Sequence, residues 1–318
     1  MKKILNIEPE HIRDYGDCQS AILYKLFGYY KIPHFERMFA SDGHVSYIPA
    51  NNIDLPFDMN KLFKLPISNY FMLLEKDYNI RTLNISSSNI TGMIKSVDNG
   101  NPIILNGRAV DMPWRPCEDV AEVHSSVIIG YDTEKEIFIC IDPLFEANYL
   151  ELPFENIQFY DEKTKLQVLD IKRLKKDIFY NLVELPNFFR SFDGKEMSWD
   201  CYIKLCNDIL KKNAVGKIFD FNYYNYLLDS TTWFYWGSRN AKINMFFEYI
   251  YREYKDEKYL RMQKWAYQAF MAIKNASTLV IKYGQTGDNM IIFKVVEKIL
   301  ESGECEKQIY HIIMGYDD

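Results

Sequence analysis

Hydrophobic and polar positions follow different patterns in the two halves of the chain. Up to about residue 165, short β-rich runs are interrupted by brief helical stretches, whereas the second half places apolar residues every three or four positions, the period of an amphipathic helix. The pattern breaks at Leu185-Pro186-Asn187 and at Ser191-Phe192-Asp193-Gly194. We therefore predict two domains, residues 1–175 and residues 190–318, of which the second is all-helical. Its helices are expected over residues 199–210, 219–236, 241–254, 259–283 and 290–300.

The first domain is predicted to contain a helix that begins at a cysteine. After Cys18, apolar side chains recur at helical spacing up to about Tyr30, and Asp17 stands where a helix N-cap belongs. Cys18 would lie in the first turn, where free backbone amides and the positive end of the helix dipole favour a thiolate over a thiol. The negative charge of Asp17 acts in the opposite direction. Other elements expected in this domain are helices over residues 62–74 and 90–97 and strands over residues 81–85 and 102–107.

A β-hairpin is predicted between residues 123 and 142. Val123–Asp132 and Ile137–Asp142 are rich in β-branched and apolar residues, and polar residues separate them. Antiparallel pairing would bring His124, at the start of the first strand, to the same end of the ladder as Asp142, at the end of the second. A thiol becomes a strong nucleophile when an imidazole takes its proton and a third group holds that imidazole in one tautomer. Cys18, His124 and Asp142 could supply these three functions.

Each of these three residues also has a purely structural interpretation. A free cysteine at a helix start is often a small buried hydrophobe. A histidine can be a polar residue at a strand edge, and Asp142-Pro143 is a common way to start a turn. It is the combination and order of the three residues that favours a catalytic site.

The residues and their order resemble the papain-like superfamily, in particular the bacteriocin-processing type of cysteine peptidase and the amino-terminal domain of the butirosin-biosynthesis acyltransferase family. Four segments in about the first half of the chain carry the resemblance: Asp17-Cys18 with its helix, Phe39–Tyr47, His124–Asp132 and Ile141-Asp142-Pro143. It implies an α+β papain-like cysteine-protease fold, in which the helix that carries the cysteine packs on an antiparallel sheet, with the all-helical domain appended. A weaker resemblance extends to papain-like amide-forming enzymes of closthioamide-type nonribosomal pathways.

By this resemblance Cys18 is the nucleophile, His124 the general base and acid, and Asp142 the residue that orients His124. Papain-like peptidases also carry a Gln several residues before the Cys, whose amide helps to bind the oxyanion, and residues 11–16 contain no Gln. The butirosin-type acyltransferases are similar in lacking this pattern, and that family joins an acyl group from a carrier-protein thioester to an amine. Besides the backbone N–H of Cys18, the candidate oxyanion donors are the side chains of Gln19, Tyr15 and Arg13.

Substrate-binding residues are expected in two loops. The loop that follows the strand at residues 102–107 is rich in proline and charge and leads to His124, and loops held by a rigid sheet commonly shape pockets. The family-like turn Ser41-Asp42-Gly43-His44 could line the same cleft. In both places a solvated connection is the alternative. The candidate side chains are His44, Tyr47, Arg108, Asp111, Trp114 and Arg115.

Composition limits the expected partners and setting. The 318 residues, 48% hydrophobic and 26% charged, are typical of a soluble globular chain that is long enough for two cores. The net charge of −6, with Lys and Arg scattered, offers no basic stripe, so nucleic acid is not an expected partner. No apolar run approaches the length of a membrane span and no standard signal peptide is present, so we expect a cytoplasmic protein without membrane contact. Six cysteines without a dense framework suit a reducing compartment, and the absence of zinc-binding spacings predicts no metal.

Three functions remain open at this point. The first is an acyltransferase of natural-product biosynthesis, which forms an amide between an acyl group on an acyl or peptidyl carrier protein and a small-molecule amine. It would need no cofactor beyond the phosphopantetheine arm of the carrier. The second is a peptidase or amidase that uses water as the acceptor. The third is a non-catalytic binding protein that uses the aromatic helical half, although aromatic residues at helical spacing usually fill a core. We rank them in this order because an added helical domain suits two substrates and the exclusion of water.

Overall fold

The structure is a computed structural model. It describes residues 1–12, 17–49, 63–64, 70–86, 88–108, 112–114, 123–144, 146–158, 165–175, 181–191, 193–214 and 223–316. The chain forms two compact units, each continuous in space but not in sequence. The sheet unit comprises Met1–Phe35 and Asn69–Ile178, and the helical unit comprises Glu36–Ser68 and Phe179–Asp318.

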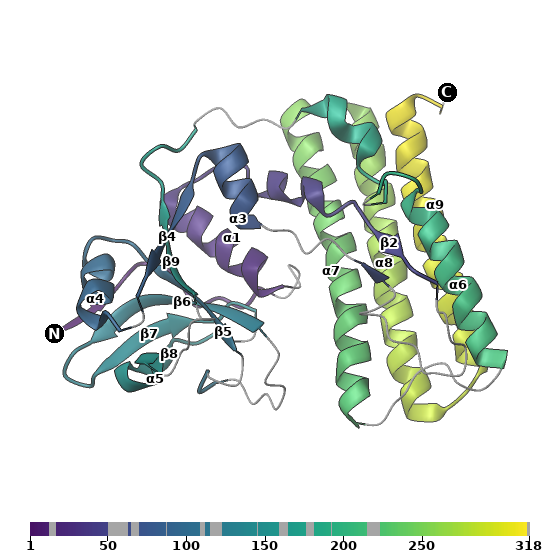
Figure 1. The fold of residues 1–318 in the computed structure, drawn as a ribbon. Coiled ribbons are helices and arrows are strands. Elements are labelled where there is room, and N and C mark those ends of the chain that lie inside the picture. Colours follow the sequence, from purple (N-terminus) through teal and green to yellow (C-terminus); the bar gives the residue numbers. More distant parts are fainter. Residues whose placement is uncertain are drawn as a thin grey trace. The chain divides into compact units, whose positions relative to one another are not determined.

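The sheet unit is built on an antiparallel sheet that has seven strands among the described residues (Figure 1). The hairpin predicted from the sequence lies near its centre, where β6 pairs with β7 and Val127 faces Ile141. The strand order is β4-β9-β5-β6-β7-β8, and β1 also pairs with β6. The strands are β1 (Lys2–Ile4), β4 (Arg81–Ile85), β5 (Ile103–Arg108), β6 (Val123–Asp132), β7 (Ile137–Ile141), β8 (Leu150–Pro153) and β9 (Lys165–Asp170).

Helix α1 (Cys18–Tyr30) packs against β6 and brings its N-terminus to the sheet. Its apolar face, which includes Ile22, Leu23, Leu26 and Phe27, is buried, as the spacing predicts. The other helices of this unit are α3 (Tyr70–Leu73), which continues into a π-helical turn at Leu74–Tyr78, α4 (Ile90–Asp98) and α5 (Phe154–Gln158). The helix predicted over residues 62–74 is wrong in its position: Phe63–Lys64 form strand β3, and the residues between them and Asn69 lie outside the described ones. Pro66 in the middle of that segment removes a backbone donor that a helix needs.

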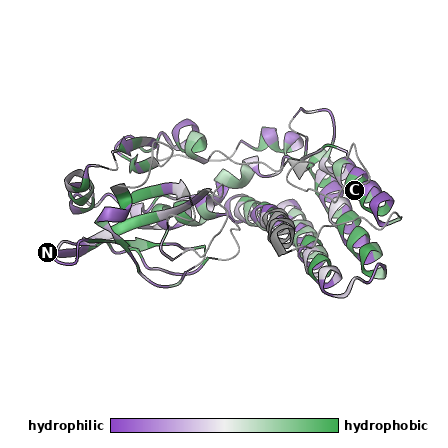
Figure 2. Cartoon of the chain, turned by 60° about the horizontal axis from the view of Figure 1, so that its bottom comes forward, coloured by the Kyte–Doolittle hydropathy of each residue, from purple (hydrophilic) through white to green (hydrophobic). Residues whose placement is uncertain are grey.

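The helical unit consists mainly of four long helices that carry hydrophobic and hydrophilic positions side by side (Figures 1 and 2). α7 packs on α8, and α9 packs on both α8 and α6. The two helices predicted over residues 219–236 and 241–254 are one helix, α7, and the last helix extends beyond the predicted residue 300. The long helices are α6 (Ser198–Ala214), α7 (Tyr223–Tyr254), α8 (Glu257–Thr286) and α9 (Met290–Met314). Two 3₁₀ helices, η1 (Phe35–Ser41) and η4 (Leu182–Asn187), and the strand pair β2 (Ser46–Tyr47) and β3 complete the elements of the described chain.

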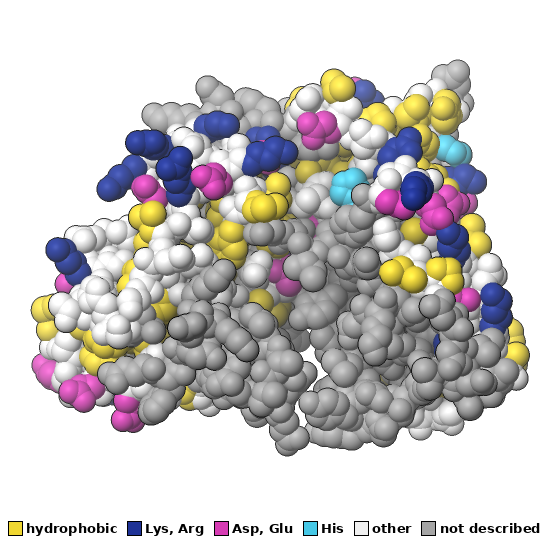
Figure 3. Space-filling model, in the orientation of Figure 1, with side chains coloured by type: hydrophobic (Ala, Val, Ile, Leu, Met, Phe, Trp, Pro, Cys, Tyr) yellow, Lys and Arg dark blue, Asp and Glu magenta, His cyan; other side chains and the backbone are white. Residues whose placement is uncertain are grey.

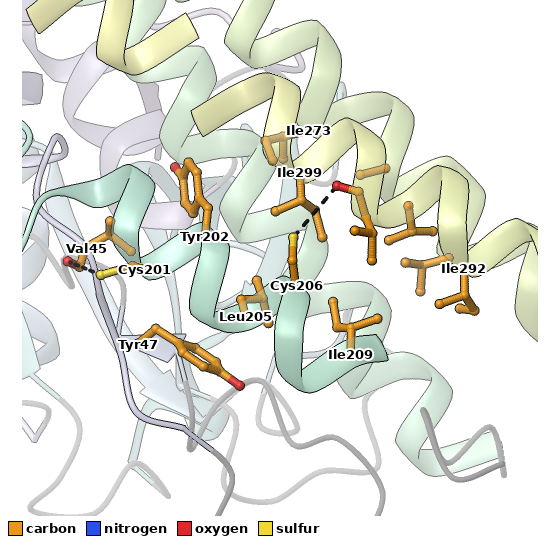
Figure 4. Close-up of a cluster of buried hydrophobic side chains, with 14 of the residues drawn as sticks. Val45, Tyr47, Cys201, Tyr202, Leu205, Cys206, Ile209, Ile273, Ile292 and Ile299 are labelled. Atoms are coloured by element: carbon orange, nitrogen blue, oxygen red, sulfur yellow. Dashed lines mark hydrogen bonds between the residues drawn. The ribbon is translucent and has the colours of Figure 1, made fainter. Parts of the chain in front are cut away.

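The described residues 36–49 and 63–64 belong to the helical unit, although the sequence analysis placed them in the first domain. Val45 and Tyr47 are part of an apolar core with residues of α6, α8 and α9, among them Tyr202 (Figure 4). A buried guanidinium, that of Arg239 in α7, donates from Nη2 to the carbonyl oxygen of Gly43 at 2.5 Å. These contacts link segments that are far apart in the sequence.

Charged side chains of both signs lie on the face of the molecule drawn in Figure 3. Acidic side chains lie among the Lys and Arg side chains there. Within the described residues, no helix is both long and apolar enough to cross a membrane.

Candidate active site

The position of Cys18 is set by the start of α1. Asp17 is the N-cap, with extended backbone angles, and its Oδ1 accepts a hydrogen bond from the backbone N–H of Ser20 at 2.7 Å. The hydroxyl of Ser20 donates to Asp17 Oδ2 at 2.8 Å, so both carboxylate oxygens are held. Cys18 is therefore the first helical residue, and its side chain is partly exposed. The backbone amides of a first turn have no partner within the helix and can serve a negative charge.

His124 and Asp142 meet at the end of the β6–β7 ladder. The distance between His124 Nε2 and Asp142 Oδ2 is 2.7 Å, and both side chains are almost fully buried. His124 is the second residue of β6, and Asp142 directly follows β7. The structure thus brings together the two residues that the predicted hairpin would make neighbours.

Cys18 forms the third member of the group through a hydrogen bond with His124. Because Nε2 of the imidazole faces Asp142, the nitrogen that remains for Cys18 is Nδ1. Burial lowers the pKa of His124, but its hydrogen bonds with Asp142 and Cys18 and the charges of both groups outweigh burial and raise that pKa to about 9. The imidazolium form of His124 is consequently favoured at neutral pH.

Trp114 contacts the same carboxylate. Its indole Nε1–H donates to Asp142 Oδ2 at 3.0 Å. The other oxygen of this carboxylate, Oδ1, is buried and has no hydrogen-bond partner among the described residues. Trp114 was predicted as a substrate-binding residue, whereas the structure places its polar atom on Asp142.

The family comparison is consistent with this geometry. A model described as the Peptidase_C39 like family matches residues 7–165, half of the chain. The chain belongs to the Peptidase_C39 like family. The matched residues contain Cys18, His124 and Asp142, and the mixed helix and antiparallel sheet arrangement is that of an α+β papain-like fold. The family is of papain-like cysteine-peptidase type, which agrees with the resemblance to the papain-like superfamily drawn from the sequence.

Among solved structures, one similar chain is the crystal structure of a "putative C39-like peptidase" from Bacillus anthracis. It is 19% identical in sequence, the match covers 54% of the present chain and 99% of that one, and the TM-score is 0.35. A search of the curated proteins found no match.

Two predicted substrate-binding residues of this C39-like chain belong to the helical unit. His44 Nδ1–H donates to the carbonyl oxygen of Arg190 at 2.8 Å. The hydroxyl of Tyr47 donates to Asp208 Oδ2 at 2.8 Å, and the Tyr47 ring lies in the helical core. Both side chains thus have structural partners in that unit, and their contact with substrate stays a prediction.

The remaining predicted side chains are described only in part. Gln19, the second residue of α1, is half-buried, and Arg108 is described only by its backbone at the end of β5. The other candidates for the oxyanion and the substrate, Arg13, Tyr15, Asp111 and Arg115, lie outside the described residues.

The other cysteines differ from Cys18 in burial. Burial raises the pKa of Cys201 to about 11 and those of Cys206 and Cys305 to about 12. Cys140 is fully buried, and burial raises its pKa further. Cys18 is therefore the accessible thiol among the described cysteines, whereas Cys117 lies outside them. In the described part of the chain, no group of three or more His, Cys, Asp or Glu side chains is placed to hold a metal ion.

The sequence analysis missed a link between the segment before Cys18 and the turn after Asp142. The backbone N–H of Ile12 donates to the carbonyl oxygen of Pro143 at 2.7 Å, and His11 Nε2–H donates to that of Leu144 at 2.5 Å. These bonds tie the approach to the cysteine to the turn that carries the carboxylate. No local pattern indicates them, because their partners are more than a hundred residues apart in sequence.

Proposed function

We propose that this protein transfers acyl groups through a thioester formed on Cys18, and that the acceptor is an amine. The observation that carries the proposal is the continuous set of hydrogen bonds from Cys18 through His124 to the buried carboxylate of Asp142. An imidazole that bridges a thiol and a carboxylate in this way is the arrangement that activates a cysteine nucleophile.

The residues account for each step of such a reaction. The Cys18 thiolate attacks the acyl carbonyl and forms a C–S bond, while the backbone N–H groups at the start of α1 can stabilise the oxyanion. The imidazolium of His124 gives its proton to the leaving group when the bond to it breaks. The neutral imidazole then takes a proton from the incoming amine as the amine attacks the thioester and Cys18 leaves as thiolate. Asp142 holds the ring orientation throughout.

The proposed donor is an acyl group held as a thioester on the phosphopantetheine arm of an acyl or peptidyl carrier protein. A thioester is more reactive than an amide, so its conversion into an amide needs no nucleotide. The absence of the peptidase-type Gln from residues 11–16 is a feature that the chain shares with the butirosin-type acyltransferases it resembles.

Hydrolysis of an amide or peptide is the second candidate, and the family match favours it. It uses the same three residues in the same order, with water in place of the amine. The two candidates differ in what discharges the acyl-enzyme, which is a property of the acceptor pocket.

Intact-protein mass spectrometry distinguishes them. The protein is mixed with a panel of acyl thioesters and of short peptides, and primary amines are then added. We expect a thioester adduct that Cys18→Ala lacks, that Cys305→Ala retains as the matched control, and that His124→Ala forms more slowly. Discharge to an amide by added amine supports transfer, whereas discharge by water alone shows a hydrolase. A Cys18 that forms no adduct and resists alkylation would contradict both and leave a binding protein.

A further inference from the structure

The carboxylate of Asp142 uses its two oxygens unequally. Both hydrogen bonds that it accepts fall on Oδ2: one from His124 Nε2 at 2.7 Å and one from Trp114 Nε1 at 3.0 Å. Oδ1 is buried and accepts no hydrogen bond from the described residues. The side chain of Asp142 is fully buried.

Because both hydrogen bonds fall on one oxygen, few contacts fix the orientation of the Asp142 carboxylate. The terminal torsion of an aspartate is broad and roughly two-fold, so the two oxygens of an isolated side chain exchange easily. His124 alone does not fix this torsion, because its Nε2–H can donate to either of the two equivalent carboxylate oxygens. An indole N–H has one direction and only donates, and it therefore selects Oδ2 and the plane in which that oxygen lies.

The bond from Trp114 also matters for charge. Hydrogen bonds to an ionised group are stronger than those between neutral groups, and a buried carboxylate needs them to stay charged. Trp114 is only half-buried and precedes β6 in the chain, whereas the carboxylate that accepts its hydrogen bond is buried.

We propose that Trp114 is a positioning residue, which holds the Asp142 carboxylate in the orientation that keeps His124 aligned with Cys18. The inference rests on the proposed function, since it assigns Trp114 to the same catalytic group. Contact between the Trp114 side chain and the substrate stays a prediction, which the test below separates from positioning. The role is indirect: Trp114 acts on the thiol only through Asp142 and His124.

The test uses alkylation of Cys18 by iodoacetamide at about pH 6, where an ordinary thiol is almost fully protonated and reacts slowly. This assay needs no substrate and reports only whether the imidazolium holds a thiolate. We expect Trp114→Phe, which keeps an aromatic ring but removes the N–H, to slow alkylation by about tenfold to a hundredfold, the range for a lost hydrogen bond to a charged group. Trp199→Phe, the same change in the helical unit, is the matched control and should leave the rate unchanged.

A double-mutant cycle separates positioning from a general structural effect. If Trp114 acts through Asp142, then Trp114→Phe has no further effect in a protein that already carries Asp142→Ala. NMR titration of the His124 ring should also show a lower midpoint in Trp114→Phe than in wild type. Thermal unfolding checks that each variant is folded, and Asp142→Asn takes the place of Asp142→Ala in the cycle if the latter is not.

Three results would overturn the inference. One is wild-type alkylation in Trp114→Phe. Another is an equal slowing of alkylation by Trp114→Phe with and without Asp142. The third is a raised KM for the acyl donor with unchanged alkylation, which would return Trp114 to substrate binding. A wild-type Cys18 that is itself unreactive at this pH contradicts the proposed function instead, so the two failures are distinguishable.

Discussion

Replacing Asp142 by Asn should move the alkaline limit of activity downward. The change keeps the size of the side chain but removes the negative charge that lies 2.7 Å from His124 Nε2. A pKa raised from 6.5 to about 9 corresponds to about 3 kcal/mol of preference for the imidazolium. Because burial acts against the imidazolium, Asp142 and Cys18 together contribute more than this amount. Without Asp142, we expect the pKa of His124 to fall to its ordinary value or below.

The assay is the pH dependence of kcat/KM for acyl transfer. In the wild type, kcat/KM should fall as the pH rises through about 9, because the imidazolium that protonates the leaving group is lost. In Asp142→Asn this limit should lie below about pH 7, and kcat/KM at about pH 8 should drop roughly thirtyfold or more, which is the loss of the imidazolium fraction when the pKa returns to its ordinary value. Asp98→Asn is the matched control, since Asp98 accepts a hydrogen bond from Tyr131 elsewhere in the sheet unit. An alkaline limit that stays near pH 9 in Asp142→Asn would refute the reasoning.

The raised pKa of His124 also predicts how the free energy of unfolding depends on pH. A histidine whose pKa is raised on folding stabilises the folded state fully below the unfolded value of 6.5, and this stabilisation is lost as the pH rises through about 9. The wild type should therefore lose unfolding free energy between these two pH values, relative to Asp142→Asn. Urea denaturation of both proteins at the two ends of this range measures the difference.

The remaining predictions concern the helical unit and use urea denaturation as the measurement. Glu306→Gln leaves the buried guanidinium of Arg239 without the carboxylate that binds it at 2.7 Å, and should cost about 3–5 kcal/mol of unfolding free energy; an unchanged midpoint would contradict this. Gly43→Ala would place a Cβ 2.3 Å from the carbonyl oxygen of Phe188, so we expect a loss of about 1–3 kcal/mol, and a neutral effect would show that the segment moves away at little cost. Tyr47→Phe removes a hydrogen bond to a buried carboxylate and should cost about 1–3 kcal/mol, unless water replaces the lost donor.

Local sequence patterns were sufficient to predict the helix that begins at Cys18 and the hairpin that carries His124 and Asp142. The N-cap and the apolar spacing place Cys18 at a helix start, and a hairpin with a short polar turn places His124 beside Asp142. In each case the deciding interactions lie within one element or between two that are adjacent in sequence. The sequence therefore predicts the local surroundings of Cys18 and of the His124–Asp142 pair, and α1 packs on β6, the strand that carries His124.

Long-range contacts explain what the sequence could not predict. Gly237-Ser238-Arg239-Asn240 looks like a break between helices, but in the structure it continues α7, because Arg239 is buried against Glu306 of α9. Asn240 likewise donates to a serine of α9 at 3.0 Å. Arg239 and Asn240 have hydrogen-bond partners more than sixty residues away, and no periodicity in a short window can show that.

The contact between Trp114 and Asp142 is another long-range interaction that the sequence could not predict. A tryptophan in a loop rich in proline and charge suggests a surface contact, and its sequence neighbours give no sign of a carboxylate within reach. Its acceptor lies at the end of β7, 28 residues later, and is brought near by the pairing of β6 with β7. A contact of this kind is hard to predict from a single sequence, since the sheet register determines which residues become neighbours.

The Ser41–His44 turn shows that part of the first half of the chain is buried by the helical unit. The family match spans residues 7–165, yet the described residues 36–49 and 63–64 within it belong to the helical unit. Val45 is fully buried among residues of those helices, and Gly43 lies against the backbone of Phe188 too closely for any side chain. A fragment of residues 1–175 would retain this segment without the surfaces that bury it. The family-matched half of the chain therefore depends on the second half for part of its own packing.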